Sequence, residues 1–530
     1  MELLASVLLS LFAALAPGER NWGDQGDGTY INPVLNADYS DPDVIRVGRK
    51  FYMVASDFHF VGMQILESDD MVNWTVVTQI FDRFDLPGWD SNSHYAGGSW
   101  APSLRYHDGR FWVYFCTPDE GLFMTTAKRA RGPWEPLCHV RDVRKWEDPC
   151  PVWDDEGNAY LGRSAHGAGP IILHRMSADG RTLLDEGDTI YQGPVAEGTK
   201  FYRKDGWWYL IIPEGGVGTG WQTALRSRNL YGPYERRIVL EQGSTDINGP
   251  HQGALVQGLA NDEWWFYHFQ EKHPMGRVVH LQPAHWEDGW PVIGTDYDGN
   301  GIGEPVYRHS KPSLDSPRLM KRSKVRLPQT SDSFKRRKLS PQWQFCHNPH
   351  DAFWSLNEKR GWLTIHAQKS GTLMMAHNML TQKCMGWSGQ VTTVFDASAM
   401  EDGQRAGLLC MGQSFYGLGL LKENGRLYLY SDVMFRAQKI KEYTGTTICV
   451  SIKYDAVENR FQYLCGPGPD ELEPVGQPFS QRNGNWKGCR FGLYTYNTEE
   501  DAGLVRFDSF DYPVKHSGYP EPDSLNQVKH

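Results

Sequence analysis

The chain has 530 residues and a formal net charge of −10, with 40% hydrophobic and 22% charged residues. The chain is longer than a single domain with one hydrophobic core usually is, and its composition is that of a globular protein rather than a disordered one. The acidic balance does not favour nucleic-acid binding, which needs clustered basic charge, and no segment is long and apolar enough to span a bilayer.

The first 16 residues have the features of a leader. Residues 3–16 form an apolar run that ends in a small-x-small pattern, Ala14 to Ala16. We expect residues 1–16 to be a secretory signal peptide and the protein to be secreted or periplasmic. No Lys or Arg precedes the run and Pro17 follows it, so an inert leader is the alternative reading.

Residues 29–315 contain a degenerate repeat. Each copy starts at a polar or small residue beside a short apolar run, followed by an aromatic-rich strand pattern, an alternating strand pattern and a turn. The five copies start at Asp41, Ala101, Asp148, Glu197 and His251, with steps of 47 to 60 residues. A period near 50 residues with several strands per unit is typical of propeller blades. We therefore predict a five-bladed β-propeller.

The second half of the chain has a different pattern. Residues 316–328, rich in Pro and basic residues, are interpreted as a linker. Residues 329–515 again show short alternating strands, which predict a β-sandwich, and residues 516–530 form a polar tail. The whole chain is thus expected to be all-β. The nine cysteines are scattered and odd in number, and several lie in apolar strand patterns, which favours buried thiols over disulfides.

Three of the five repeat starts are carboxylates: Asp41, Asp148 and Glu197. The innermost strands of a propeller converge on its axis, so these side chains should meet in space. Gathered like charges raise the pKa of at least one member, which favours a functional role. Cleavage of a glycosidic bond needs one carboxylic acid and one carboxylate. The alternative is that Asp41 and Asp148, which both precede Pro, only form turns.

The motifs around these carboxylates resemble those of glycoside hydrolase family 43. The resemblance is carried by Tyr39–Val44, Trp146–Trp153 and Val195–Tyr202, with support from Ser99–Leu104, Pro213–Gly216 and Gly249–Gly253. The stretches Trp343–Pro349 and Phe353–Leu356 resemble the concanavalin A-like jelly roll that follows the catalytic domain in this family's β-xylosidases and α-L-arabinofuranosidases.

The resemblance implies an inverting mechanism. Asp41 would be the general base that activates water, and Glu197 the general acid. Asp148 would orient Glu197 and modulate its pKa. Inversion needs room for a water molecule, so the base and acid carboxyls should lie roughly 6.5–9.5 Å apart.

Further positions match sugar-binding residues of the family. Arg277 matches an arginine that contacts sugar hydroxyls, and its alternative is a surface-strand arginine. Phe58 and Trp100 match aromatic walls of the pocket, although blade packing would explain either equally well. Trp486 is a candidate for the sandwich loop that closes the pocket, and an ordinary sandwich-core Trp is the alternative.

His251 matches a histidine beside the central channel. In many relatives this channel holds a calcium ion or waters. Calcium prefers oxygen ligands, so water-mediated contact or a structural hydrogen bond is an equal alternative to direct ligation by His251. No cofactor is expected for the chemistry itself.

The resemblance implies an exo-acting enzyme that releases terminal xylose and arabinofuranose from xylo-oligosaccharides and arabinose-substituted xylan fragments. The rival enzymatic reading is an arabinofuranosidase alone, or an arabinan or galactan hydrolase. A rival of another class is a carbohydrate-binding protein without activity, and a third is a structural scaffold. The sequence leaves the oligomeric state open.

Overall fold

The computed structural model describes residues 22–91, 94–260, 262–316 and 325–514. The expected leader, the expected tail and linker residues 317–324 lie outside the described residues. The described part is almost entirely β-strand, with three single-turn 3-10 helices, η1 (Trp89–Ser91), η2 (Asp351–Phe353) and η3 (Leu373–Met375). The all-β prediction is confirmed, and no helix in these ranges is long and apolar enough to cross a membrane.

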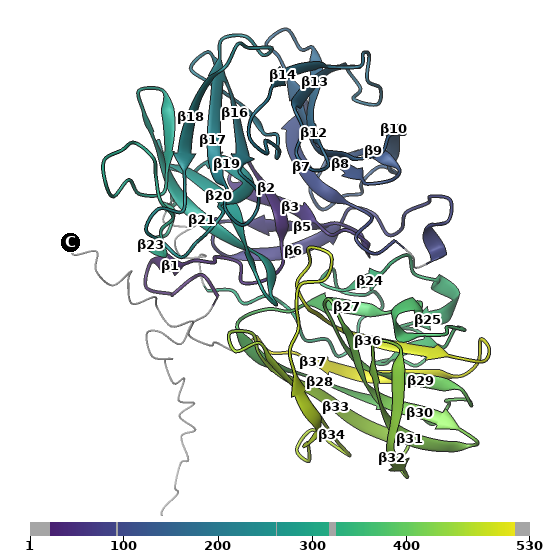
Figure 1. The fold of residues 1–530 in the computed structure, drawn as a ribbon. Helices are drawn as coiled ribbons and strands as arrows, with labels where there is room; N and C mark the ends of the chain where they lie inside the picture. The colour runs from purple at the N-terminus through teal and green to yellow at the C-terminus, as the bar shows by residue number, and fades with distance from the viewer. Residues whose placement is uncertain (1–21, 92–93, 261, 317–324, 515–530) are drawn as a thin grey trace, which may run out of the picture.

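The N-terminal half is a five-bladed propeller, seen in the upper part of Figure 1. Each blade is a four-stranded antiparallel sheet, and the Asp-Gly pairs at 108–109 and 205–206 adopt the positive φ angles of tight hairpin turns. The blades are β2 (Ser40–Val47), β3 (Lys50–Ser56), β5 (Gln64–Ser68) and β6 (Trp74–Gln79); β7 (Trp100–His107), β8 (Arg110–Thr117), β9 (Gly121–Ala127) and β10 (Cys138–Arg141); β11 (Trp146–Trp153), β12 (Ala159–Ala165), β13 (Ile171–Met176) and β14 (Asp188–Tyr191); β15 (Phe201–Lys204), β16 (Trp207–Glu214), β17 (Trp221–Ser227) and β18 (Glu235–Leu240); and β19 (His251–Gln257), β20 (Trp264–Lys272), β21 (Gly276–Glu287) and β22 (Trp290–Ile293).

The two ends of the propeller are tied together. Strand β1 (Thr29–Ile31) pairs antiparallel with β23 (Arg308–Ser310), almost 280 residues later in the chain. Separate hydrophobic clusters fill the spaces between neighbouring blades. The alternating strands therefore bury both faces of each blade, which accounts for the high content of aromatic residues.

The C-terminal half is a β-sandwich of two antiparallel sheets, seen in the lower part of Figure 1. In spatial order, one sheet contains β32 (Arg436–Tyr443), β31 (Arg426–Val433), β30 (Phe415–Glu423), β29 (Gln404–Met411), β36 (Arg490–Asn497), β27 (Leu380–Lys383), β24 (Gln344–Cys346) and β4 (Phe60–Val61). The other contains β25 (Trp354–Ser355), β26 (Leu363–His366), β37 (Leu504–Asp511), β28 (Ser388–Asp396), β33 (Thr447–Asp455), β34 (Arg460–Gly466) and β35 (Glu473–Phe479). All nine cysteines are free thiols, as expected.

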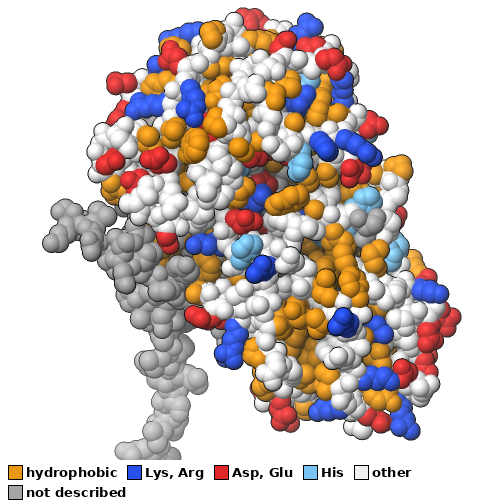
Figure 2. Space-filling view, in the orientation of Figure 1, with side chains coloured by type: hydrophobic (Ala, Val, Ile, Leu, Met, Phe, Trp, Pro, Cys, Tyr) orange, Lys and Arg blue, Asp and Glu red, His pale blue; other side chains and the backbone are white. Residues whose placement is uncertain are grey.

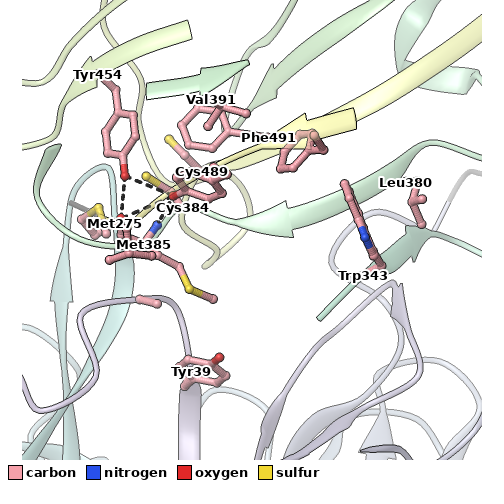
Figure 3. Packing of buried hydrophobic residues seen from close by; sticks show 14 of the residues in the cluster. Tyr39, Met275, Trp343, Leu380, Cys384, Met385, Val391, Tyr454, Cys489 and Phe491 are labelled. Carbon is pink, nitrogen blue, oxygen red and sulfur yellow. Dashed lines mark hydrogen bonds between the residues drawn. The ribbon is translucent and has the colours of Figure 1, made fainter. Parts of the chain in front are cut away.

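The propeller and the sandwich share a sheet and a core. Strand β4 belongs by sequence to the first blade, yet it pairs with β24 at the edge of the sandwich sheet. One continuous cluster of buried apolar side chains extends across the boundary. Figure 3 shows members of this cluster from both parts, Tyr39 and Met275 from the propeller and Met385 and Tyr454 from the sandwich.

A buried ion pair also crosses the boundary. Lys383 of β27 donates to Asp57, which follows β3, with 2.8 Å between Nζ and Oδ1. Both side chains are almost completely buried, and the Arg490 guanidinium lies 3.7 Å from the same carboxylate oxygen. Burial raises the pKa of Asp57, but Lys383 and Arg490 outweigh it, and the pKa lies below its ordinary value. This pair fixes the residue that precedes Phe58.

Two buried histidines stack across the same boundary. The rings of His59 and His347 lie 4.9 Å apart, and the His347 amide donates to the His59 carbonyl. Burial lowers the pKa of His347 to about 3, and nearby His94 contributes to the shift. Burial, with a contribution from His347, also holds the pKa of His59 well below its ordinary value. Both rings are therefore neutral in the folded protein.

This arrangement predicts loss of stability in acid. Below pH ~6.5 the unfolded chain protonates these histidines while the folded chain does not, so stability is lost as the pH falls from ~6.5 toward the folded pKa. Each histidine should lower the free energy of unfolding by about 1.4 kcal/mol per pH unit in this window. In urea unfolding measured from pH 7 to 4.5, His347→Phe should reduce the slope of the free energy of unfolding against pH by that amount. The exposed control His285→Phe should leave it unchanged, and equal slopes in all three proteins would contradict the prediction.

Candidate active site

The innermost strands of four blades share an irregularity at the same place. Their first residues shift register against the next strand, between Ser40 and Asp43, Trp100 and Ser103, Glu147 and Cys150, and His251 and Gly253. Each of these bulges contains a residue with positive φ, namely Asp41 (53°), Ala101 (31°), Asp148 (56°) and Gln252 (28°). Non-glycine residues rarely adopt such angles, and they persist at sites where the surroundings enforce them. The bulges redirect side chains toward the propeller axis.

The fourth blade uses a loop instead. Glu197 precedes β15 by four positions, so it is not a strand residue as the repeat suggested. Its amide donates to the Pro213 carbonyl, and the next residue, Gly198, donates to the Asp148 carboxylate over 2.8 Å. Gly198 has φ of +63°, and a Cβ there would lie 2.4 Å from the Pro213 side chain. The loop is therefore held by its neighbours on both sides.

These residues line one cavity of about 250 Å³ at the centre of the propeller. This volume suits a single small ligand rather than a polymer chain. In Figure 2, acidic, basic and histidine side chains gather near the middle of the face, where the propeller meets the sandwich. The lining residues are Asp41, Phe58, Trp100, Ala101, Glu147, Asp148, His166, Gly167, Ala168, Val195, Glu197, Val217, Gln252, Arg277 and Trp486. The structure thus brings together all seven residues that the sequence predicted as catalytic or substrate-binding.

Asp41 is held by three side-chain donors. Ser56 donates to one carboxylate oxygen over 2.6 Å, and Ser40 to the same oxygen over 3.1 Å. Arg277 donates to the other oxygen over 2.8 Å, and its guanidinium lies over the ring of Phe269. Arg277 is therefore a pocket residue rather than a surface-strand arginine. This set of donors fixes the orientation of the carboxylate at the pocket floor.

Asp148 is completely buried and accepts three hydrogen bonds. The donors are the Ser164 hydroxyl at 2.5 Å, the Gly198 amide at 2.8 Å and the Gln252 amide group at 2.6 Å. Burial raises its pKa to about 6, and the nearby charge of Glu197 adds to the shift. The roles of Gln252, Ser164 and Ser56 were missed by the sequence analysis, since nothing in the repeat distinguishes these residues from packing residues.

Glu147 is a fourth carboxylate in the cavity that the sequence analysis also missed. One carboxylate oxygen from each of Glu147, Asp148 and Glu197 lies within 4.8 Å of the other two. Burial raises the pKa of Glu147 to about 9, and the charges of Asp148 and Glu197 add to the effect. Adjacent strand residues normally point to opposite faces. The bulge at Asp148 is what lets both neighbours face the cavity, and sequence alternation alone gives no sign of it.

His251 lies beside a carboxylate of the cavity. It is buried at the start of β19, and its Nε2 lies 3.2 Å from Oε1 of Glu197. Its Nδ1 is buried with no hydrogen-bond partner among the described residues. Calcium takes oxygen ligands, so these two nitrogens do not fit direct ligation. His251 contacts a carboxylate of the cavity, which favours the structural alternative, while a water-mediated calcium contact stays a prediction and no step is derived through a metal ion.

The sandwich contributes one wall of the cavity. The loop before β36 extends from the sandwich to the propeller (Figure 1), where Gly488 donates to Asp38 over 3.2 Å. Trp486, in this loop, is 42% exposed and stacks with Phe58 at a centroid distance of 6.5 Å. It also meets Trp100 edge-on at 5.5 Å. Trp486 is therefore a cavity residue rather than a sandwich-core Trp, and the cavity is incomplete without the sandwich.

Comparison with known proteins gives consistent results for both parts. Residues 30–291 match the family model described as glycosyl hydrolases family 43, and residues 331–513 match that of a beta xylosidase C-terminal concanavalin A-like domain. A protein of Xylanibacter ruminicola, provisionally named a beta-xylosidase, is 55% identical over 478 residues, which cover 90% of this chain and 88% of that protein. A beta-xylosidase of Formosa agariphila is 36% identical over 569 residues, covering 96% of this chain and 93% of its own.

Solved structures agree on the fold. A bifunctional GH43-CE protein of Bacteroides eggerthii superposes with a TM-score of 0.81 at 25% identity, covering 92% of this chain and 64% of that one. This chain therefore spans slightly less than two thirds of that protein. A xylan beta-1,4-xylosidase of Bacillus halodurans superposes with a TM-score of 0.79 at 22% identity, covering 91% of this chain and 99% of that one.

Proposed function

This chain belongs to glycosyl hydrolase family 43, and we propose that it is an inverting exo-β-xylosidase that also releases terminal α-L-arabinofuranose. The observation that carries the proposal is the small cavity in which carboxylates from three blades meet Arg277 and aromatic walls. A cavity of about 250 Å³ has room for the end of a chain, not its middle. Removal of one sugar at a time follows from that shape.

The proposed mechanism assigns one role to each carboxylate. Asp41, oriented by Ser56 and Arg277, accepts a proton from the water that attacks the anomeric carbon. Glu197 donates a proton to the glycosidic oxygen as the bond to the departing sugar breaks. Asp148 holds the loop of Glu197 through the Gly198 amide and modulates the pKa of the acid. Each cleavage of a glycosidic bond consumes one water molecule and releases two products, the terminal sugar and the departing sugar.

Arabinofuranosidase activity is the second part of the proposal. It is supported by a non-reducing end α-L-arabinofuranosidase of Bacteroides ovatus that is 29% identical over 435 residues, covering 75% of this chain and 77% of that protein. The two terminal pentoses present similar hydroxyls to one small pocket. We also propose that the protein acts outside the cytoplasm on xylo-oligosaccharides and arabinoxylan fragments, on the basis of its expected leader and of its relatives' substrates.

The stereochemistry of the first product tests the mechanism. Proton NMR of the protein acting on xylobiose should show α-xylose released first, because water attacks from the face opposite the β-linkage. Early release of β-xylose would contradict inversion and the role of Asp41 as base. An aryl arabinofuranoside serves as the second substrate in the same assay, and failure of the protein to cleave either substrate would overturn the proposed function.

A further inference from the structure

Glu147 and His166 form a polar pair on one wall of the cavity that the proposed mechanism does not use. Oε2 of Glu147 lies 3.6 Å from Nδ1 of His166. Both residues line the cavity, Glu147 from β11 and His166 from the loop after β12. The Glu147 side chain is 11% exposed and the His166 side chain 42% exposed. The pair therefore extends from the buried carboxylates toward the open side of the cavity.

Two tryptophans frame the outer member of this pair. The His166 ring lies 5.3 Å from Trp100 and 6.3 Å from Trp486, the latter edge-on. Trp486 is also partly exposed, whereas Trp100 beside it is buried, so His166 and Trp486 form the rim of the cavity. When a chain end enters a closed pocket, the terminal sugar occupies the bottom and the sugar next to it remains at the rim. The rim is therefore the place of the departing sugar.

The inner member of the pair lies beside the bond that breaks. One carboxyl oxygen of Glu147 lies within 4.8 Å of one of Glu197, and Glu197 is the group proposed to protonate the linking oxygen. A group at that distance from the acid reaches the first hydroxyls on either side of the bond. Because burial raises the pKa of Glu147 to about 9, its carboxyl is neutral near pH 7, and it can both donate to and accept from a hydroxyl.

We propose that Glu147 and His166 bind hydroxyl groups of the departing sugar, and so favour oligosaccharides over substrates whose leaving group has no hydroxyls. The proposal rests on the proposed function and adds a specificity role for two residues. A polar site that binds a hydroxyl rejects an analogue that lacks it, because its own groups are then left unpaired.

The test compares xylobiose with methyl β-xyloside. Both have alkoxide leaving groups that need the acid, but only xylobiose has hydroxyls on the departing part. Glu147→Leu and His166→Phe should each lower the ratio of kcat/KM for xylobiose to that for methyl xyloside by about tenfold, the loss expected for one hydrogen bond. Glu147→Gln should keep the ratio within about threefold, because the amide also donates and accepts.

A second Glu–His pair offers a matched control. At the exposed end of β21, Nε2 of His285 lies 2.9 Å from Oε1 of Glu287, and both side chains are more than half exposed. Glu287→Leu and His285→Phe should leave the ratio unchanged. Thermal unfolding of each variant checks that it folds. At pH 7, Glu147→Leu should unfold no earlier than the parent, because it removes a carboxyl that is charged in the unfolded chain and must take up a proton on folding.

The outcomes separate this inference from the proposed function. An equal loss on both substrates would show that Glu147 acts through Glu197 rather than on the departing sugar, and it would overturn the inference while the function stands. The inference would also be overturned if neither Glu147→Leu nor His166→Phe changed the ratio of kcat/KM for xylobiose to that for methyl β-xyloside. If the parent cleaves neither substrate, the proposed function itself fails, and the inference fails with it.

Discussion

Glu197→Gln is expected to lower kcat on xylobiose by roughly 10²–10⁴-fold, the contribution of a positioned general acid. Glutamine keeps the shape and the backbone contacts of the loop but cannot give a proton to the glycosidic oxygen. The loss should therefore be far smaller for a nitrophenyl xyloside, whose leaving group departs without protonation. Steady-state kinetics on both substrates, with thermal unfolding to check the fold, measures the effect.

Glu287→Gln serves as its control, since this residue is exposed on the last blade away from the cavity. It should leave both substrates unaffected. A Glu197→Gln enzyme that kept more than half of its activity on xylobiose would contradict the assignment of the acid. An equal loss on xylobiose and on the nitrophenyl xyloside would point to disrupted binding rather than to lost proton donation.

Lys383→Ala is expected to lower the free energy of unfolding by about 3–5 kcal/mol, the cost of leaving a buried charge without its partner. Asp57 would keep only the Gln64 amide and the more distant Arg490 guanidinium. Because Phe58 follows Asp57 directly and lines the cavity, KM should also rise. Urea unfolding and steady-state kinetics on one preparation measure both effects.

The exposed ion pair between Lys439 and Glu423 offers a matched control. Both of its side chains are more than two fifths exposed, so Lys439→Ala should cost no more than about 1 kcal/mol. Removing both charges of the buried pair, with Lys383→Met and Asp57→Asn together, should recover part of the loss. If Lys383→Ala and Lys439→Ala unfold at the same urea concentration, the buried pair does not hold the two parts together.

The architecture was largely predictable because propeller blades repeat. Alternating strands and hairpin turns act locally, so five copies starting near Asp41, Ala101, Asp148, Glu197 and His251 predict five blades without knowledge of tertiary contacts. The convergence of the three catalytic candidates follows from the same repeat, since equivalent positions of successive blades meet at the axis.

What could not be predicted depends on contacts between distant segments. Glu147 faces the cavity only because Asp148 adopts positive φ, and strand alternation alone would place it on the other side. The environment of His251 depends on where the loop of Glu197 lies, which no local pattern encodes. The pairing of β4 with the sandwich joins residues 60–61 to residues 345–346, a separation over which sequence periodicity carries no information.

That pairing determines how the chain can be divided. A cut in the linker looks harmless in the sequence, yet it would leave Phe60 and Val61 in one fragment and their partner strand β24 in the other. Each fragment would then present an unpaired strand edge and an uncovered apolar surface to solvent, the conditions under which chains self-associate. Efforts to shorten this protein for expression or immobilisation should therefore retain both halves in one polypeptide.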